Sequence, residues 1–369
     1  MQILFRIKGL LIITVFFFSC SEEIDSEKET SSKSSENKSK SQNKDAWQVS
    51  KKEIQGNTQG TTYLVKTSED SLKVSPEELD SLLHQFDLEL SGYIDHSLLS
   101  KFNQANDFVD LSNDNFFRTC YHISQDVYQR TDGDFDPSVF PLVKAWGFFK
   151  DLENTPTKDE IDSILSFTGF ELGLHHKFEN DTLFKLHPKF SLDFNAIAQG
   201  QSVDEIVRFL RKKGNENIFV EVGGELYVNG KNDEGKPWVI GIDEPSEDND
   251  GHGNRKLENY LSISKGGVAT SGNYRKFYEK GGKKYSHTLN PKTGQPVEHN
   301  LLSATVIAPN TAAADAYATA FMVMGVEKTM NFLEENNDLQ LAVYLLFEND
   351  QGRIERAYNS KMNEYFLEL

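Results

Sequence analysis

The sequence predicts an α+β fold in which mixed, largely antiparallel sheets pack against helices, arranged as two lobes of one body. Six short apolar runs are typical of strands, and turns rich in Gly, Asn and Asp join several of them without an intervening helix, which favours antiparallel pairing. The sequence contains neither G-x-G-x-x-G nor a Walker A motif, which disfavours the doubly wound nucleotide-binding folds. The predicted strands are 218–222, 226–230, 238–242, 260–264, 302–308 and 341–347.

Helical patterns precede and separate these strands along the sequence, and the first of these patterns is the clearest. Residues 76–90 place apolar side chains on one face, behind Ser75 as N-cap and Pro76 at the first helical position. Glu78 lies three residues after the cap, so this helix is predicted to begin with a capping box. The other predicted helices are 114–131, 157–166 with a capping box from Thr157 to Glu160, 196–213 ended by Gly214, and the Ala-rich 311–335.

Charge and hydropathy exclude two classes of protein. The 369 residues include 39 Lys and Arg against 57 Asp and Glu, a formal net charge of −18. Such a chain does not neutralise nucleic-acid phosphates, so no nucleic-acid partner is expected. The only long apolar run, residues 9–18, is shorter than the roughly 20 residues that span a bilayer, which excludes a polytopic membrane protein.

Residues 1–19 resemble a bacterial lipoprotein signal. Arg6 and Lys8 precede the apolar run, and Ser19 stands directly before Cys20, which would become the lipidated mature N-terminus. The alternatives are an ordinary signal peptide with an incidental cysteine, or a strand. The lipoprotein pattern predicts an extracytoplasmic protein on the periplasmic side, in contact with a bacterial membrane through its lipid anchor only.

A polar linker is expected at 20–45, and the folded body at 46–369. Residues 21–45 contain one aliphatic side chain, Ile24, so they cannot bury enough surface to offset the entropy of ordering. Cys120, the only cysteine besides Cys20, stands in an apolar helical pattern and is expected to be a buried core residue. The mature body therefore forms no intramolecular disulfide.

Nine short stretches carry the functional signal because of their order, although each alone is weak. Together they resemble the FAD:protein FMN transferase family, the ApbE-like flavin transferases, over residues 56–347. The stretches are QGTTY (59–63), SGYIDHSLLSKFN (91–103), GDFDPSVFPLVKAWGF (133–148), LDFNAIAQG (192–200), VGGELYV (222–228), WVIGIDEP (238–245), GGVATSGNYRKF (266–277), YSHTLNPKTGQPV (285–297) and ADAYATAFMVMG (314–325).

The resemblance implies an ApbE-like, T-fold-like architecture and a transferase with FAD as substrate and Mg²⁺ as cofactor. Such an enzyme cleaves the FAD pyrophosphate, transfers FMN to a Thr or Ser hydroxyl of an acceptor protein and releases AMP. By analogy, the acceptor is a subunit of an electron-transfer complex or an extracytoplasmic flavoprotein.

A metal site is predicted in the Ala-rich helix. Asp315 and Thr319 are four residues apart and share one helix face, and their carboxylate and hydroxyl oxygens suit Mg²⁺. The resemblance adds the backbone carbonyl of Ala196 as a third ligand. The alternative is that Asp315 caps the helix start near Thr311 while Thr319 only packs.

The resemblance also assigns the catalytic base and the FAD contacts. The base is His287, beside a turn imposed by Asn290, Pro291 and Gly294, and a neutral imidazole suits deprotonation of a hydroxyl. The implied FAD contacts are Tyr93, Phe135, Asp136, Asp193, Gln199, Glu225, Ser271, His287 and Leu289.

Three neighbouring features are interpreted less specifically. Thr270, Ser271 and Gly272 have the small size of a turn that faces a pyrophosphate, although a plain turn is an equal interpretation. Gly223 and Gly224 are expected to form a tight turn between two strands. Two aromatic residues could line the flavin, but a place in the core is favoured. These are Trp146 and Phe148.

One departure from the family pattern affects ligand recognition. Gln199 stands where Lys is common, and Gln201 follows the glycine where an aromatic residue is common. A neutral amide hydrogen-bonds a flavin edge or a phosphate but supplies no charge. Two alternative functions remain: an FAD-binding or FAD-hydrolysing lipoprotein that yields FMN and AMP, and a non-catalytic solute-binding lipoprotein.

Overall fold

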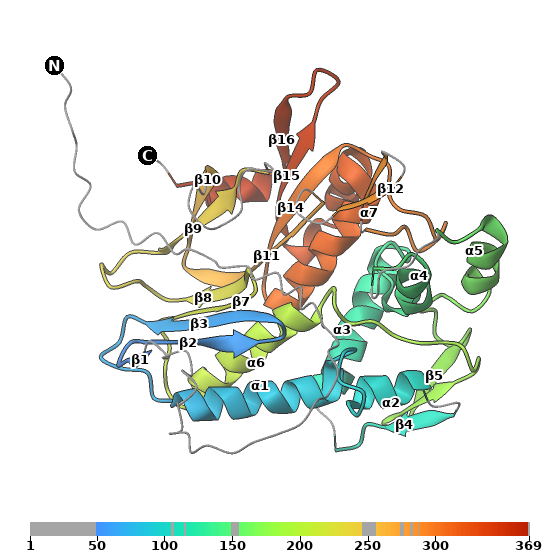
Figure 1. The fold of residues 1–369 in the computed structure, drawn as a ribbon. Coiled ribbons are helices and arrows are strands. Elements are labelled where there is room, and N and C mark those ends of the chain that lie inside the picture. The colour runs from blue at the N-terminus through green and yellow to red at the C-terminus, as the bar shows by residue number, and fades with distance from the viewer. Residues whose placement is uncertain are drawn as a thin grey trace, which may run out of the picture.

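The computed structural model describes residues 49–104, 107–113, 116–148, 155–245, 256–273, 277–280, 283–286 and 288–367. Its centre is a nine-stranded sheet in which every neighbouring pair is antiparallel, and this confirms the predicted α+β class (Figure 1). In spatial order the strands are β1 (Val49–Ser50), β2 (Glu53–Thr58), β3 (Thr61–Thr67), β7 (Ile218–Val222), β8 (Glu225–Asn229), β11 (Lys265–Gly272), β14 (Leu301–Ala308), β15 (Ala342–Glu348) and β16 (Ile354–Tyr358).

The hairpin of β7 and β8 shows how the sequence sets the register of the sheet. Val222 pairs with Glu225, so the loop has two residues, Gly223 and Gly224. Their φ angles of 61° and 112° lie in the region that glycine adopts without steric cost. The predicted glycine turn is confirmed.

Three long helices cover one face of the sheet. They are α1 (Pro76–Leu90), α6 (Ala198–Lys212) and α7 (Thr311–Glu335). Both halves of the predicted capping box are present at α1: Ser75 accepts from the Glu78 N–H, and Glu78 accepts from the Ser75 N–H. The buried face of α1 packs with α6 against alternate residues of β7, such as Ile218 and Val220.

The opposite face of the sheet is covered by a hairpin of β9 (Trp238–Asp243) and β10 (Leu257–Ile263), together with a short 3-10 helix at Ser360–Glu364. Phe219 of β7 points to this side and packs against Trp238. Because neighbouring strand residues face opposite ways, every residue of β7 is buried by one layer or the other.

The second lobe lies on the side away from β9 and β10 (Figure 1). Its elements are α2 (Leu98–Gln104), β4 (Phe108–Asp110), α3 (Phe116–Arg130), a 3-10 turn at Pro137–Val139, α4 (Phe140–Ala145), α5 (Lys158–Leu165), β5 (His176–Glu179) and β6 (Thr182–Lys185). A hairpin of β12 (Phe277–Lys280) and β13 (Lys283–Ser286) and a 3-10 turn at Asn337–Leu339 complete the described elements. One apolar cluster runs from Phe117 and Phe190 of this lobe to Phe321 of α7, so the two lobes form one body.

The predicted helices and strands occur with small shifts of their ends. The capping box from Thr157 to Glu160 is present in α5, and Cys120 is fully buried in the core, as expected. The prediction of a turn at Thr270–Gly272 is wrong, because these residues end strand β11 and pair with β14. The predicted signal and linker lie outside the described residues. Within the described residues, no helix is long and apolar enough to cross a membrane.

Helix α7 contains a break that the sequence pattern did not predict. Gly325 has φ 75° and ψ −178°, which is not helical. The ring of His299 packs against this glycine, and its Nε2 lies 2.8 Å from the carbonyl oxygen of Met322. The break therefore leaves a backbone acceptor that a side chain satisfies, as buried helix irregularities require.

Candidate active site

The start of helix α6 is built against helix α7. Gly200 lies in the first turn of α6, and its N–H donates to Oδ2 of Asp315 at 3.1 Å. A Cβ at position 200 would lie 2.5 Å from the carbonyl oxygen of Thr311 and 2.8 Å from Cβ of Asp315. The close contact of the two helices therefore requires glycine, and it places the Asp315 carboxylate at the α6 N-terminus.

Asp315 does not cap its own helix, so the alternative interpretation of this residue is wrong. The side chain of Asn310 accepts from the Ala313 N–H at 2.8 Å. The two carboxylate oxygens of Asp204 accept from the N–H groups of Thr311 and Ala312 at 2.8 and 2.9 Å. These contacts satisfy the first donors of α7 and leave Asp315 available for another role.

The donor set around Asp315 fits a hard cation. The carboxylate is buried, and this burial together with the nearby Asp204 raises the pKa of Asp315 to about 7, against the opposing effect of the Gly200 N–H. A bound cation would offset the cost of that buried charge. One helical turn onward, Oγ1 of Thr319 lies 3.3 Å from Oγ of Ser271 on β11. Ala196 lies in the turn that leads into α6.

The predicted metal site is not of the kind that consists of several acidic, histidine or cysteine side chains. Within the described part of the chain, no three such side chains gather where they could hold an ion. The predicted set has one carboxylate, one hydroxyl and one backbone carbonyl, and such a set suits Mg²⁺, which keeps several waters and takes phosphate oxygens from its substrate.

Gln199 and Glu225 lie beside the glycine turn at which strand β8 begins. A Cβ on Gly223 would be 2.8 Å from Nε2 of Gln199 and 2.9 Å from Cγ2 of Thr61, so the amide packs directly on the glycine turn. Strand β11 pairs with β8 only over Lys265–Val268, because β8 starts at Glu225. The last residues of β11, including Ser271, therefore extend past the first residue of β8.

A second group of predicted site residues lies before α6. The backbone N–H of Asn195 donates to Oδ1 of Asp193 at 2.8 Å, and Nδ2 of Asn195 lies 3.5 Å from the hydroxyl of Tyr93. Tyr93 is 67% exposed, which is unusual for an aromatic ring. Asp136 joins this group, because the N–H of Asp193 donates to the carbonyl of the following Pro137 at 2.7 Å.

Asp136 and Phe135 have structural roles as well. Oδ1 of Asp136 accepts from the N–H and the hydroxyl of Ser138 at 2.7 and 2.6 Å. Burial raises the pKa of Asp136 to about 6, while the Ser138 hydrogen bonds act in the opposite direction. The Phe135 side chain is buried in the main apolar cluster.

The segment 192–200 links the two groups of site residues. Asn103 holds its beginning, since Oδ1 accepts from the Leu192 N–H and Nδ2 donates to the Leu192 carbonyl, both at 2.8 Å. Its end is held by the hydrogen bond that the Gly200 N–H donates to Asp315. Sequence reasoning assigned no site contact to Asn103, Asp204 or Thr61, because each contacts residues that are distant in the sequence.

The last predicted site residues lie near α4 and α5. Leu289 packs with Leu142 and Ile161, and Trp146 lies at the edge of the same cluster with its indole N–H donating to the Gly294 carbonyl at 2.7 Å. Phe148 packs against the same cluster, and both aromatic residues are partly buried there. His287, like Cys20, lies outside the described residues.

Comparison with known proteins shows which family this chain resembles. The model of the ApbE family matches residues 59–345. The FAD:protein FMN transferase of Haemophilus influenzae is 35% identical over 315 residues, covering 82% of this chain and 88% of that protein. The enzyme of the same name from Escherichia coli K12 is 31% identical over 320 residues, covering 85% and 88%.

Solved structures agree with the sequence matches. The flavin transferase ApbE from Vibrio cholerae superimposes with a TM-score of 0.74 at 32% identity, covering 85% of this chain and 98% of that one. The ApbE protein from Thermotoga maritima gives a TM-score of 0.71 at 26% identity, covering 86% and 99%. The family match spans more than half of the chain and includes the site built around α6 and α7. The chain therefore belongs to the ApbE family.

Proposed function

We propose that this chain transfers FMN from FAD to a Thr or Ser hydroxyl of an acceptor protein and releases AMP, with Mg²⁺ as its cofactor. The observation that carries the proposal is the contact between Asp315 and Gly200, which sets a buried carboxylate at the start of α6 beside Thr319 and Ser271. The relatives named FAD:protein FMN transferase support the reaction class over solute binding.

The chain would hold the diphosphate of FAD at the start of α6. A helix N-terminus carries partial positive charge and free N–H groups, and both favour a phosphate. Asp315, Thr319 and the Ala196 carbonyl would hold Mg²⁺, which when bound stabilises negative charge on phosphate oxygens. Gln199, which packs on the Gly223 turn, adds a neutral donor where the family commonly supplies a cation.

The transfer balances without a covalent intermediate on this chain. The acceptor hydroxyl oxygen forms a bond to the phosphorus of the FMN half, and the bond from that phosphorus to the bridging oxygen breaks. AMP leaves with the bridging oxygen, and the hydroxyl proton passes to a base. The family resemblance assigns this base to His287, and an imidazole is suited to the step near neutral pH.

Flavin recognition is proposed for the loop residues before α6 and for the residues beside the glycine turn before β8. The exposed ring of Tyr93 offers a flat apolar surface, whereas partial desolvation at its hydroxyl, followed by the nearby charge of Asp193, raises the pKa of that hydroxyl. Glu225, Ser271 and Leu289 complete the set together with Asp136 and the backbone of Phe135.

The proposal extends to location. The order of Arg6, Lys8, an apolar run and Cys20 supports a lipid-anchored protein outside the cytoplasmic membrane, where the acceptor would be an extracytoplasmic flavoprotein or a subunit of an electron-transfer complex. Residues 21–45 would tether the body to the anchor.

The deciding experiment is mass spectrometry of the full chain mixed with FAD, Mg²⁺ and candidate acceptors from the same genome. A gain of one FMN on a Thr or Ser of an acceptor, with equal release of AMP, is the expected result. Equal FMN release with and without acceptor would instead support FAD hydrolysis. Tight FAD binding without any AMP would support a binding protein.

A further inference from the structure

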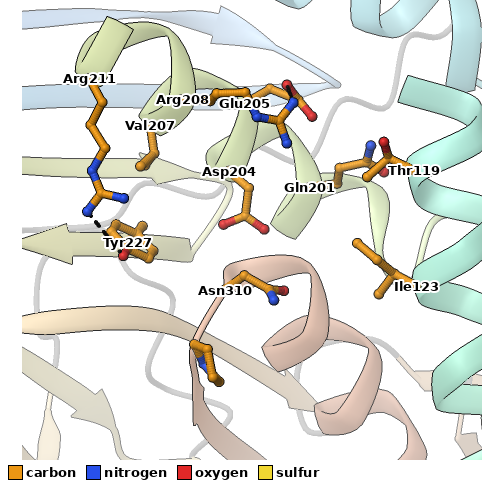
Figure 2. Close-up of a pocket in the computed structure, with 11 residues that line it drawn as sticks. Thr119, Ile123, Gln201, Asp204, Glu205, Val207, Arg208, Arg211, Tyr227 and Asn310 are labelled. Carbon is orange, nitrogen blue, oxygen red and sulfur yellow. Dashed lines mark hydrogen bonds and ion pairs between the residues drawn. The ribbon is translucent and has the colours of Figure 1, made fainter. Parts of the chain in front are cut away.

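The arginine side chains beside helix α6 bind partners within the chain. Figure 2 shows them at a cavity between α6, α3 and the residues that precede α7, where Nη2 of Arg211 donates to the Tyr227 hydroxyl at 3.4 Å. Arg208 forms an ion pair with Glu205 at the same cavity. A different part of the surface presents large side chains that the chain leaves uncovered.

Four large apolar side chains are exposed around the three-stranded sheet of the second lobe. This sheet has the strand order β4, β6, β5 and lies at the edge of that lobe (Figure 1). Phe108 of β4 is 56% exposed, and Leu186, directly after β6, is 49% exposed. Leu172 and Leu174, in the loop before β5, are 52% and 51% exposed. Seven large apolar side chains are exposed in the described part of the chain, so more than half of them gather here.

The register of this sheet places two aromatic residues on the side away from the core. Phe108 pairs with Phe184, and Phe184 pairs with Lys177, so the three side chains share one face. Leu186 follows Phe184 by two residues and lies on the same face. The neighbouring row of residues points the other way, into the main apolar cluster. That row consists of Val109, Leu183 and Phe178.

The side chains on the uncovered side contact one another. The ring centres of Phe108 and Phe184 lie 5.7 Å apart, and Nζ of Lys177 lies 4.6 Å from the centre of the Phe184 ring. The same Nζ lies 3.1 Å from Oε2 of Glu179, so the lysine charge is paired. The result is an apolar surface with a neutralised charge at its border.

Backbone hydrogen bonds hold the two loop leucines next to this surface. The N–H of Gly173, which lies between them, donates to the His176 carbonyl at 2.9 Å. The N–H of Leu186 donates to the His175 carbonyl at 2.8 Å. The loop is thus fixed beside β5, and its leucines extend the apolar surface. We call the whole surface the outer face; it consists of Phe108, Leu172, Leu174, Phe184 and Leu186.

The proposed lipid anchor indicates what covers the outer face. Residues 21–48 separate Cys20 from β1, and a chain of that length reaches at most about 90 Å. A body of this size is about 50 Å across, so an anchored body can turn its outer face to the bilayer. Because the anchor makes the contact intramolecular, a surface with weak intrinsic affinity is sufficient.

We propose that the outer face docks on the lipid bilayer that carries the anchor, with its Phe and Leu side chains in the boundary between headgroups and acyl chains. The inference rests on the lipid anchor proposed above. The aliphatic stem of Lys177 suits the same boundary, with its ammonium among the headgroups. A bilayer requires no directional polar contact, which matches a face whose lysine is already paired, whereas a protein interface typically adds about ten hydrogen bonds.

Vesicle sedimentation tests the outer face without the anchor. The sample is the chain from position 20 onward with Cys20→Ser, since residues 1–19 contribute nothing to the described body. The probe is neutral phosphatidylcholine vesicles at high lipid concentration. Weak sedimentation is expected, and it should persist at high salt, because salt screens charges and not apolar contacts.

Two double variants locate the contact. Phe108→Ser with Leu186→Ser removes two exposed side chains of the outer face, so sedimentation should fall by about tenfold or more. The matched control is Ile354→Ser with Tyr358→Ser, which removes the two exposed apolar side chains of β16 and should sediment as the parent does. Because all four side chains are exposed, thermal melting is expected to show both variants folded.

The anchored chain shows which face meets the bilayer. A fluorophore attached to Leu174→Cys is selective, because Cys20 would carry the lipid and Cys120 is fully buried. Nitroxide-labelled lipids should quench this fluorophore. The same fluorophore on Ile354→Cys should stay unquenched, since Figure 1 shows β16 away from β4 and β5.

Failure of the anchor and failure of the docking face are distinguishable. Mass spectrometry of the unlabelled chain reports whether Cys20 carries lipid; an unmodified Cys20 would refute the anchor, and sedimentation would then decide the docking proposal alone. Absence of both sedimentation and quenching overturns that proposal, as does equal sedimentation of the two double variants.

Two further results would assign the outer face to another occupant and so overturn the proposal. A dimer in solution that Phe108→Ser with Leu186→Ser dissociates would assign it to a second copy of this chain. Loss of acceptor labelling by that variant in the absence of vesicles would assign it to the acceptor protein.

Discussion

The N–H of Gly200 donates a hydrogen bond to Oδ2 of Asp315 at 3.1 Å, so a carboxylate in the interior of α7 caps the start of α6. One contact thus joins α6, where we propose that the diphosphate binds, to α7, which carries the proposed metal ligands. The arrangement positions both groups on the same side of the sheet, and the predictions below follow from it.

Asp315→Asn is expected to abolish Mg²⁺-dependent release of AMP while FAD still binds. The amide can still accept the Gly200 N–H, so the fold is retained, but the anionic ligand is lost. A loss of several kcal/mol in charge stabilisation corresponds to about 10²-fold or more in rate. The assay is AMP release against Mg²⁺ concentration, with Asp70→Asn, an exposed loop residue, as control. Wild-type turnover in Asp315→Asn, unaffected by EDTA, would exclude this metal site.

Gly200→Ala should separate the two helices. Its Cβ would lie 2.5 Å from the Thr311 carbonyl oxygen, and backbone on both sides leaves little room to adjust. Overpacking of this kind costs about 1–3 kcal/mol of unfolding free energy, and the shift would also displace Asp315. Gly92→Ala is the control, because a Cβ there meets nothing within 4 Å. Equal urea midpoints for the two variants would contradict the described packing.

Local signals in the sequence were sufficient to predict much of the fold. The capping boxes at Ser75 and Thr157 and the glycine pair at 223–224 act within a few residues, so their pattern specifies the structure directly. The three-stranded sheet of β4, β5 and β6 was not predicted, because its strands are three or four residues long and carry no clear alternation.

Long-range contacts explain what the sequence could not supply. Asp204 caps α7 from a position about a hundred residues away, and no local pattern distinguishes it from a surface aspartate. Small residues such as Ser271 suggest a turn, but pairing with β14 makes this segment a strand. The spacing of Asp315 and Thr319 indicated a shared helix face, whereas their neighbours Gly200 and Ser271 emerged only from the packing of three separate elements, α6, α7 and β11.

Asp134 is expected to stabilise the junction between the loop after β13 and helix α7. Its carboxylate is 2% exposed and contacts Lys292 at 3.2 Å and Lys328. Asp134→Ala should cost about 1.5–3 kcal/mol, the range for hydrogen bonds to charged groups. Asp132→Ala is the matched control: Asp132 binds the same Lys292 but is 97% exposed, so its loss should cost less than about 1 kcal/mol. Chemical denaturation checks both, and equal losses would refute the assignment.

Asp136→Asn should stabilise the protein at neutral pH. Burial raises the pKa of Asp136 from its ordinary 3.8 to about 6, so the folded state binds the proton more tightly than the unfolded state does. The stabilisation that the folded state gains by binding this proton is complete below about pH 4. It is lost as the pH rises to about 6 and stays lost at higher pH. The shift corresponds to roughly 3 kcal/mol, since one pKa unit is about 1.4 kcal/mol.

The Asn variant removes this loss and keeps an acceptor for the Ser138 N–H. The difference in unfolding free energy between Asp136→Asn and the wild type should therefore grow in favour of the variant between about pH 4 and pH 7. Urea unfolding across that range, with Asp70→Asn for comparison, measures it. A difference that does not change with pH would show that Asp136 is not destabilised when charged.

His287→Ala distinguishes catalysis of transfer from binding of flavin. If the imidazole removes the proton from the acceptor hydroxyl, the variant should keep FAD and Mg²⁺ but label the acceptor about 10² to 10⁴ times more slowly. The wild-type rate should also rise with pH as the imidazole loses its proton. If His287 only contacts the flavin, the KM for FAD should increase while the rate at saturating FAD stays nearly constant, because uniform binding affects KM rather than kcat. The mass shift of the acceptor over time at saturating FAD separates these outcomes, and labelling by His287→Ala at the wild-type rate would exclude the histidine as base.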